Sequence, residues 1–347
     1  MKTVAAILVE QRRPLVVDEV EVPALGYGQV LVEIKASRIC GSQLGEIDGV
    51  KGADRFLPHL LGHEGGGVVL EVGPEVRRVR VGDRVVLHWR PGQGIEARPP
   101  VYQWGGRKVN AGFVTTFNRL GVISENRLTV VPPEIDYEVC CLLADTLTTG
   151  FGIINNDAAV KIGEAVVVIG CGGIGLGVVL GAKLAGAYPV VAVDLHDAKL
   201  EVAARFGATH LINGRKADMV EAVVGLLDQG RPEVVIDGTG NPEVLEKALA
   251  LTSPQGRCIG FGVMPQDRKL SFNTLPLHLG KRLTGSHGGE SQPALDIPRL
   301  VRMMRAGVFD PRGFVSHRVT LGEVNEAIAK MRAGEVIHAL IHFDQPA

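Results

Sequence analysis

The chain has 347 residues, 46% of them hydrophobic and 22% charged, and its formal net charge is −1. This length suits two domains rather than one core, and a nearly neutral chain has no basic surface to attract nucleic acid or an acidic membrane. The five cysteines are scattered and indicate no disulfide framework, and no apolar run has the length of a leader or a membrane span, so we expect a cytoplasmic protein.

The first third of the chain reads as β-rich. Strand-like runs cover residues 30–34, 67–72 and 84–87, and turn signals at 26–28 and 81–83 separate them. Residues 90–112 contain three prolines and several glycines, which predict an irregular lobe or a long surface loop. Long loops in compact domains tend to be functional.

Three polar positions stand out in the first half of the chain: Cys40, His63 with its neighbour Glu64, and Asp145. Their separations of 23 and 82 residues match no local metal-binding pattern. Spacing alone therefore favours a buried cysteine, a core histidine and a helix-capping aspartate.

From about residue 162, strands and helices alternate. The apolar run 165–169 is typical of a strand buried on both faces. Further strands are predicted at 190–193, 210–212, 234–236 and 257–260, with helices after the first strand and at 198–206, 219–227 and 243–251. This alternation predicts a parallel, doubly wound sheet. After about residue 287, helices at 297–305 and 321–331 precede a last strand at 339–343.

Residues 170–175, Gly-Cys-Gly-Gly-Ile-Gly, match the pattern G-x-G-x-x-G between a predicted strand and a predicted helix. Gly170 permits the tight turn, Gly172 lets the backbone approach a pyrophosphate, and Gly175 lets helix and strand pack closely. The helix N-terminus then offers N–H groups to the phosphates. The sequence therefore predicts a dinucleotide site, the alternative being a glycine turn with no ligand.

Asp194 ends the next predicted strand. Its carboxylate would bind the ribose hydroxyls and repel a 2′-phosphate, which favours NAD over NADP. In the alternative interpretation, Asp194 only caps a helix. The predicted cofactor-binding residues are Gly170, Gly172, Gly173, Ile174, Gly175, Asp194, Lys199 and Thr149.

Several segments together resemble a known family. Residues 62–64, Gly-His-Glu, with Val72-Gly73 and the segment 82–85, Gly-Asp-Arg-Val, resemble the zinc alcohol dehydrogenase signature of the medium-chain dehydrogenase/reductase superfamily. Residues 40–42, Cys-Gly-Ser, resemble that family's first metal-ligand segment, and 147–150, Leu-Thr-Thr-Gly, resemble the stretch after its third ligand. The resemblance covers nearly the whole chain.

The resemblance implies an α/β protein with an inserted domain. A doubly wound parallel Rossmann domain, residues 147–286, would bind NAD. It would interrupt a β-rich, irregular barrel-like (GroES-like) catalytic domain made of residues 1–146, with the zinc site, and the return segment 287–347.

The resemblance also implies a catalytic zinc held by Cys40, His63 and Asp145. Many members have a cysteine at the third position, so Asp145 would be an acidic variant. Three protein ligands leave the fourth position open for substrate. Cys140 and Cys141 are rival ligands, which we expect instead to be buried apolar residues of a helix.

Two further residues receive roles from the resemblance. Glu64 would lie beside the metal ligands and adjust the electrostatics of the zinc site. Ser42 would take the proton of the alcohol hydroxyl while hydride passes to NAD.

The sequence departs from the family at three single positions. Gly45 stands where many members have a histidine that finishes the proton relay, so water, a ribose hydroxyl or Glu46 would have to replace it. Gln43 stands where an aspartate commonly steadies the zinc-bound histidine; its amide oxygen can accept the same N–H bond but should raise the ligand's basicity less. His338 stands about where an arginine or lysine often meets the cofactor pyrophosphate, unless it is structural.

The lobe departs further. Many relatives bind a structural zinc with four cysteines there, but residues 90–112 contain no cysteine, so we expect one catalytic zinc per chain and no structural zinc. Aromatic and arginine side chains of the lobe would shape the substrate pocket, a subunit contact or a satellite core. They are Trp89, Arg90, Tyr102, Trp104 and Arg107.

The expected function is that of an NAD-linked dehydrogenase interconverting an alcohol with its aldehyde or ketone. Residues 148–213 look closest to the class that includes glutathione-dependent formaldehyde dehydrogenases. His88, Arg90 and Arg107 would suit a polyol, a sugar-like or an anionic substrate. Family members are usually homodimers or homotetramers. The alternatives are a zinc-free quinone or enone reductase of the same superfamily and a non-catalytic NAD-binding protein.

Overall fold

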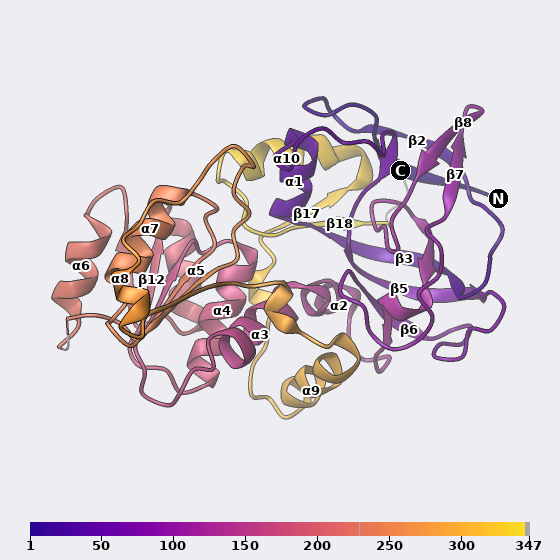
Figure 1. Cartoon of the computed structure of the whole chain (residues 1–347). Helices are drawn as coiled ribbons and strands as arrows, with labels where there is room; N and C mark the ends of the chain where they lie inside the picture. Colours follow the sequence, from indigo (N-terminus) through magenta and orange to yellow (C-terminus); the bar gives the residue numbers. More distant parts are fainter. Residues whose placement is uncertain (229, 344–347) are drawn as a thin grey trace. The chain divides into compact units, whose positions relative to one another are not determined.

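The structure, a computed structural model, describes residues 1–228 and 230–343. The chain forms two compact units: unit 1 contains Met1–Asp145 and Gln292–Ala347, and unit 2 contains Thr146–Ser291. The units divide after residues 145 and 291, whereas the predicted domains divide after 146 and 286. Unit 2 is thus inserted between two segments that pair with each other, as the purple and yellow strands β3 and β18 show in Figure 1.

Unit 1 consists mainly of antiparallel strands. Strands β1, β2, β7, β8 and β4 form a closed barrel, and a seven-stranded sheet has the order β10-β6-β5-β3-β18-β17, with β9 paired to β3. Alternate residues of β3 and β18 face one shared core, which joins the two segments. The strand bounds are β1 Lys2–Leu8, β2 Val16–Glu21, β3 Gln29–Ile39, β4 His59–Leu60, β5 Glu64–Val72, β6 Arg84–His88, β7 Val101–Trp104, β8 Arg107–Asn110, β9 Leu120–Ser124, β10 Leu128–Val130, β17 His317–Thr320 and β18 Ala339–His342.

The helices of unit 1 are short and lie between or after these strands. Asp136 begins α2, since its side chain accepts a hydrogen bond from the backbone N–H of Val139. The bounds are α1 Gly41–Asp48, α2 Tyr137–Ala144, α9 Pro293–Arg305 and α10 Val324–Arg332, with 3-10 turns at Glu125–Arg127, Arg312–Phe314 and Leu321–Glu323.

The prediction of an irregular lobe is partly wrong. Strands β7 and β8 form an antiparallel hairpin in which Tyr102 lies opposite Val109, and both side chains are completely buried. Gly105 and Gly106 make the two-residue turn with positive φ angles of 53° and 81°, as tight hairpins require. The prolines of the lobe precede the hairpin and leave its pairing undisturbed.

Unit 2 has the predicted doubly wound architecture. Its six strands are all parallel, in the order β13-β12-β11-β14-β15-β16. Every residue of β11 is buried, because helices cover both faces of the sheet. The strand bounds are β11 Val166–Ile169, β12 Val190–Asp194, β13 His210–Asn213, β14 Val234–Asp237, β15 Arg257–Gly260 and β16 Arg282–Gly285. The helix bounds are α3 Thr146–Gly152, α4 Gly173–Leu184, α5 Asp197–Phe206, α6 Met219–Leu226, α7 Pro242–Leu251 and α8 Leu275–His278, with a π-helix at Ile153–Asp157 and a 3-10 turn at Gly288–Glu290.

One helical run in the described residues, Tyr137–Asp157, is long and apolar enough to cross a membrane by length and composition alone. Its apolar window is 89% buried inside the protein. Burial of that extent is what a core helix shows, so the run is no evidence of a membrane span.

Candidate functional site

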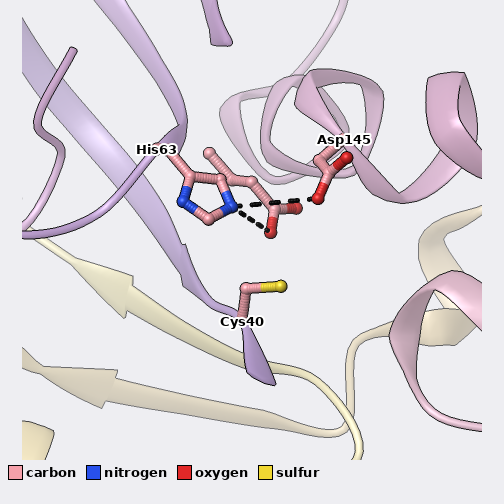
Figure 2. A group of neighbouring side chains, drawn as sticks. Cys40, His63 and Asp145 are labelled. Atoms are coloured by element: carbon pink, nitrogen blue, oxygen red, sulfur yellow. Dashed lines mark ion pairs between the residues drawn. The ribbon is translucent and has the colours of Figure 1, made fainter. Parts of the chain in front are cut away.

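Four side chains with metal-ligating atoms meet in unit 1. They are the residue after β3 (Cys40), the residue before β5 (His63), the first residue of β5 (Glu64) and the residue after α2 (Asp145). One ligand atom from each lies within 4.8 Å of the others. His63 Nε2 is 3.8 Å from Asp145 Oδ2 and 3.7 Å from Glu64 Oε1. Figure 2 shows the side chains of Cys40, His63 and Asp145 directed toward one another.

The glycines after Glu64 explain how Asp145 reaches this cluster. A Cβ atom on Gly66 would lie 2.7 Å from both the Tyr137 carbonyl oxygen and Cys140 Cβ, closer than such atoms approach. Helix α2 therefore packs directly on the backbone of β5. Because Asp145 follows the last residue of α2 and Glu64 begins β5, this close packing brings the two carboxylates together.

The cluster is buried and rich in negative charge. Glu64 is completely buried, and Cys40 and Asp145 are 7% and 5% exposed. Burial alone would lower the pKa of His63, but the nearby acidic groups of Asp145, Cys40 and Glu64 favour its charged form and outweigh burial, so the pKa of His63 is raised. These three acidic groups thus favour a cation among them.

The Arg38 guanidinium neutralises the charge of the Glu64 carboxylate. Its Nη1 lies 2.5 Å from Glu64 Oε1, and its Nε donates to His338 Nδ1 at 2.7 Å. Burial opposes the charge on Arg38, but the Glu64 carboxylate more than compensates and the pKa of Arg38 is raised. Sequence reasoning missed Arg38, and the available signal was its place two positions before the candidate ligand Cys40.

The suggested contact of His338 with a cofactor pyrophosphate is not supported. His338 is completely buried, bonded to Arg38 and stacked on Phe314 with ring centroids 5.6 Å apart. Burial, together with the neighbouring charge of Arg38, lowers the pKa of His338 well below its ordinary value. Because its imidazole is neutral and enclosed, His338 has a structural role, which was the alternative interpretation of this residue.

Two neighbours hold the candidate ligands in place. The indole Nε1 of Trp89 donates to Asp145 Oδ1 at 3.0 Å. The Gln43 amide meets His63 Nδ1 at 2.5 Å, while Gln43 Oε1 accepts the backbone N–H of Cys40 at 2.8 Å. The expected partnership of Gln43 with His63 is present, but Nε2 rather than Oε1 faces the ring, because the oxygen is engaged by Cys40. Trp89 was considered only as a pocket or contact residue.

These side chains fit a zinc ion by their chemistry. Thiolate sulfur, imidazole nitrogen and carboxylate oxygen are the donors that zinc accepts, and a catalytic site uses three of them. The rival thiols belong elsewhere: Cys140 and Cys141 are completely buried in α2, and burial raises the pKa of both. A buried, protonated thiol is a poor metal ligand.

The suggested role of His88 in binding an anionic substrate is wrong. His88 is completely buried, and its ring nitrogens lie 2.8 Å from the Arg90 carbonyl oxygen and 2.9 Å from Thr129 Oγ1. Burial lowers its pKa to about 4, so the ring is neutral near pH 7. Arg90 and Arg107 instead lie over the rings of Trp89 and Trp104, at 5.7 and 5.9 Å from their centroids.

The glycine-rich segment of unit 2 forms the turn between β11 and α4. Gly170 has φ of +89°, and a Cβ on Gly175 would lie 2.0 Å from the Gly170 carbonyl oxygen. Gly172 caps α4, and a Cβ built on it meets nothing within 4 Å. Open space therefore lies beside Gly172 at the N-terminus of α4, where the N–H groups that follow, from Gly173 and Ile174 onward, are suited to a phosphate group.

The other predicted cofactor residues also lie in unit 2. Asp194 ends β12, and its carboxylate accepts the backbone N–H groups of Cys171 at 2.8 Å and His196 at 3.0 Å. These bonds fix the carboxylate beside the glycine turn. Lys199, in α5, is near enough to act on the thiol of Cys171. Thr149 is buried in α3, the helix that precedes β11 in the chain.

Two family models match the chain. The alcohol dehydrogenase GroES-like domain matches residues 26–133, and the zinc-binding dehydrogenase model matches residues 173–306. The first match includes Cys40, His63 and Glu64, and the second covers most of the parallel sheet.

Similar proteins span the whole chain. Alcohol dehydrogenase class-3 of Cereibacter sphaeroides is 33% identical over 99% of this chain and 100% of its own length. S-(hydroxymethyl)glutathione dehydrogenase of Paracoccus denitrificans is 32% identical over 98% and 100%. Among solved structures, an alcohol dehydrogenase zinc-binding domain protein from Burkholderia ambifaria superposes with a TM-score of 0.91 at 26% identity, over 99% of this chain and 100% of that one.

Proposed function

Since the chain belongs to the zinc-binding alcohol dehydrogenases of the medium-chain dehydrogenase/reductase superfamily, we propose that it interconverts an alcohol and its aldehyde or ketone with NAD, using zinc at Cys40, His63 and Asp145. The observation that carries this proposal is the convergence of a thiol, an imidazole and a carboxylate within 4.8 Å. The alternative of a zinc-free reductase has no use for that set.

Zinc, when bound, supplies a Lewis acid that favours loss of the hydroxyl proton from an alcohol. Cys40 and Asp145 would offset its two charges, and Arg38 already neutralises Glu64, so the buried site would carry no net charge. With its carboxylate held by Arg38, Glu64 is a neighbour of the metal rather than a fourth ligand. Metal binding through His63 Nε2 would place the ring proton on Nδ1, so the Gln43 amide would have to turn its oxygen to that N–H and give up the bond from the Cys40 backbone N–H.

Other residues would handle the substrate proton and the cofactor. Ser42, exposed in the first turn of α1, would take the hydroxyl proton. The N–H groups at the start of α4 would bind the NAD pyrophosphate, and Asp194 would accept hydrogen bonds from the ribose hydroxyls. Lys199 and Thr149 would complete the cofactor site.

Finer properties of the enzyme are also proposed. The lack of cysteine in residues 90–112 supports one zinc per chain, with no structural zinc. Family membership supports a homodimer or homotetramer, and the scattered cysteines support a cytoplasmic location. The domain bounds would be those of units 1 and 2.

The substrate would be a small alcohol bearing hydroxyl groups or a negative charge. Arg90 supports this, because it lies over the ring of Trp89, whose indole binds the candidate ligand Asp145. One relative is named alcohol dehydrogenase class-3 and another S-(hydroxymethyl)glutathione dehydrogenase. S-(hydroxymethyl)glutathione therefore belongs in the panel of substrates. Faster turnover of simple aliphatic alcohols than of polyols and anionic alcohols would contradict this choice.

NADH formation, followed at 340 nm with zinc-loaded protein and the alcohol panel, tests the function. We expect turnover that falls at least about 100-fold in Cys40→Ala and persists in Cys140→Ala, the matched loss of a buried thiol outside the cluster. No oxidation of any alcohol by the loaded protein, or full turnover in Cys40→Ala, would show the proposal to be wrong.

A further inference from the structure

A second polar group lies beside the candidate metal site, on helix α1 and the segment after it. His59 Nε2 is 2.8 Å from Asp54 Oδ2 and 3.8 Å from Glu46 Oε1. His59 Nδ1 lies 2.9 Å from the carbonyl oxygen of Leu60. That carbonyl can only accept, so Nδ1 carries a proton, and Nε2 faces two carboxylates.

Helix α1 connects this group with Ser42. Residues four apart lie on the same face of a helix, with Cβ atoms roughly 5–6 Å apart. Gln43 and Ile47 form the buried face of α1, whereas Ser42 and Glu46 are both exposed. The hydroxyl of Ser42 and the carboxyl of Glu46 are therefore neighbours on the outer face of the helix, one turn apart. Gly45, between them, has no side chain to intervene.

The surroundings of Glu46 suit a group that exchanges a proton. The Glu46 side chain is 44% exposed, so water reaches it, but its partial withdrawal from solvent is the largest influence and raises its pKa, and the charge of Asp54 raises it further. His59, His63 and Lys51 act in the opposite direction without cancelling that increase. A carboxyl with a raised pKa that water can reach is suited to accept a proton and release it again.

We propose that Glu46 is the outer proton acceptor of the reaction, receiving the substrate proton through Ser42 and releasing it to solvent. This inference rests on the proposed alcohol oxidation, which frees one proton for each hydride transferred to NAD. The alcohol O–H bond breaks as Ser42 Oγ gains that proton, and the proton already on Ser42 passes to a Glu46 oxygen. Water then takes it from the exposed carboxyl. His59, 3.8 Å from Glu46 Oε1, and Asp54, which is paired with His59, are positioning residues for the Glu46 carboxyl.

Glu46→Gln tests the relay, with Asp48→Asn as its matched control on the same helix. Asp48 forms an exposed ion pair with Arg332 and does not approach His59 in the described structure. In Glu46→Gln we expect kcat for alcohol oxidation to fall about 100-fold, with a larger solvent isotope effect and partial rescue by added imidazole. Glu46→Asp should recover part of the loss, and Asp48→Asn should retain wild-type kcat.

Two measurements that do not use turnover accompany the kinetics. Carboxyl ¹³C NMR of glutamate-labelled protein identifies Glu46 as the signal lost in Glu46→Gln. That signal should titrate above the ordinary glutamate range, and Asp54→Asn should shift its midpoint down because a neighbouring negative charge is removed. Zinc content should be the same in the wild type and Glu46→Gln.

The outcomes separate this inference from the proposed function. Unchanged kcat, pH profile and isotope effect in Glu46→Gln, with an active wild type, would refute the relay and leave alcohol oxidation standing. Loss of a second bound metal ion in Glu46→Gln would also refute it, because Glu46, Asp54 and His59 would then be a cation site. A wild type that oxidises no alcohol would instead remove the function on which the relay depends.

Discussion

Trp89 provides a sharp test of how the metal ligands are held. Its indole Nε1 donates to Asp145 Oδ1 at 3.0 Å, while Asp145 Oδ2 faces His63 Nε2 at 3.8 Å. One oxygen of Asp145 is thus fixed by the indole and the other is presented to the metal position. Trp89→Phe removes the N–H donor and keeps an aromatic ring in the same place.

The expected loss follows from the type of bond. A hydrogen bond to a charged group contributes about 1.5–3 kcal/mol, which corresponds to a factor of roughly 10–150 in an equilibrium constant. Loss of a residue that orients a metal ligand typically lowers metal affinity about 10–100-fold. We therefore expect Trp89→Phe to bind zinc about 10–100-fold more weakly, measured by competition with a chromophoric chelator at fixed pH.

Trp104→Phe is the matched control. Trp104 Nε1 donates to Asp18 Oδ2 at 2.8 Å in an exposed part of the barrel, so the same chemical change is made away from the cluster. Its zinc affinity should equal that of the wild type. Equal affinity in Trp89→Phe and Trp104→Phe would refute the idea that the indole orients Asp145.

Three further predictions concern unit 2. Asp194→Asn removes the charge that would repel a 2′-phosphate, so the preference for NAD over NADP, measured as a ratio of kcat/KM values, should fall about tenfold or more; an unchanged ratio would contradict the role of Asp194. Gly175→Ala places a Cβ 2.0 Å from the Gly170 carbonyl oxygen, so NAD binding measured by calorimetry should weaken and unfolding should become easier by about 1–3 kcal/mol. Glu164→Gln breaks a pair in which Arg257 donates to both Glu164 oxygens, and should cost about 2 kcal/mol at pH 7 by urea unfolding. Burial raises the pKa of Glu164, but Arg257 lowers it by a larger amount, so the pKa is lower in the folded protein than in the unfolded chain. The stabilisation is therefore present above the unfolded-state pKa of about 4.3 and disappears as the pH falls through the lower pKa of the folded state. A Glu164→Gln penalty that did not shrink between pH 7 and pH 3 would contradict that linkage.

Most of unit 2 could be predicted from the sequence because its strands are continuous apolar runs. Val166–Ile169 is buried on both faces, and a short continuous apolar run of this kind is typical of a strand in a parallel sheet covered by helices. Strands β16 and β17 were missed because each lies at the end of its sheet and is mostly exposed or half-buried. Edge strands of this kind carry polar residues and lose the periodicity on which prediction depends.

The candidate metal site was predicted only through family resemblance. Cys40, His63 and Asp145 are far apart in sequence, and their meeting depends on the direct packing of α2 on the glycines of β5. No local pattern encodes such a contact. The neighbours Arg38 and Trp89 were missed for the same reason, since their partners Glu64 and Asp145 lie 26 and 56 residues away.

The central claim is that the cluster at Cys40, His63 and Asp145 holds the catalytic zinc. The most direct test is elemental analysis of protein purified without chelators, in the wild type and in His63→Ala, with His210→Ala, which removes a half-buried histidine of unit 2, as the control. We predict one zinc per chain in the wild type and in the control, and almost none in His63→Ala. A wild type that stays free of zinc after incubation with the metal and reduction of its thiols, or a His63→Ala variant that retains a full equivalent, would contradict the claim.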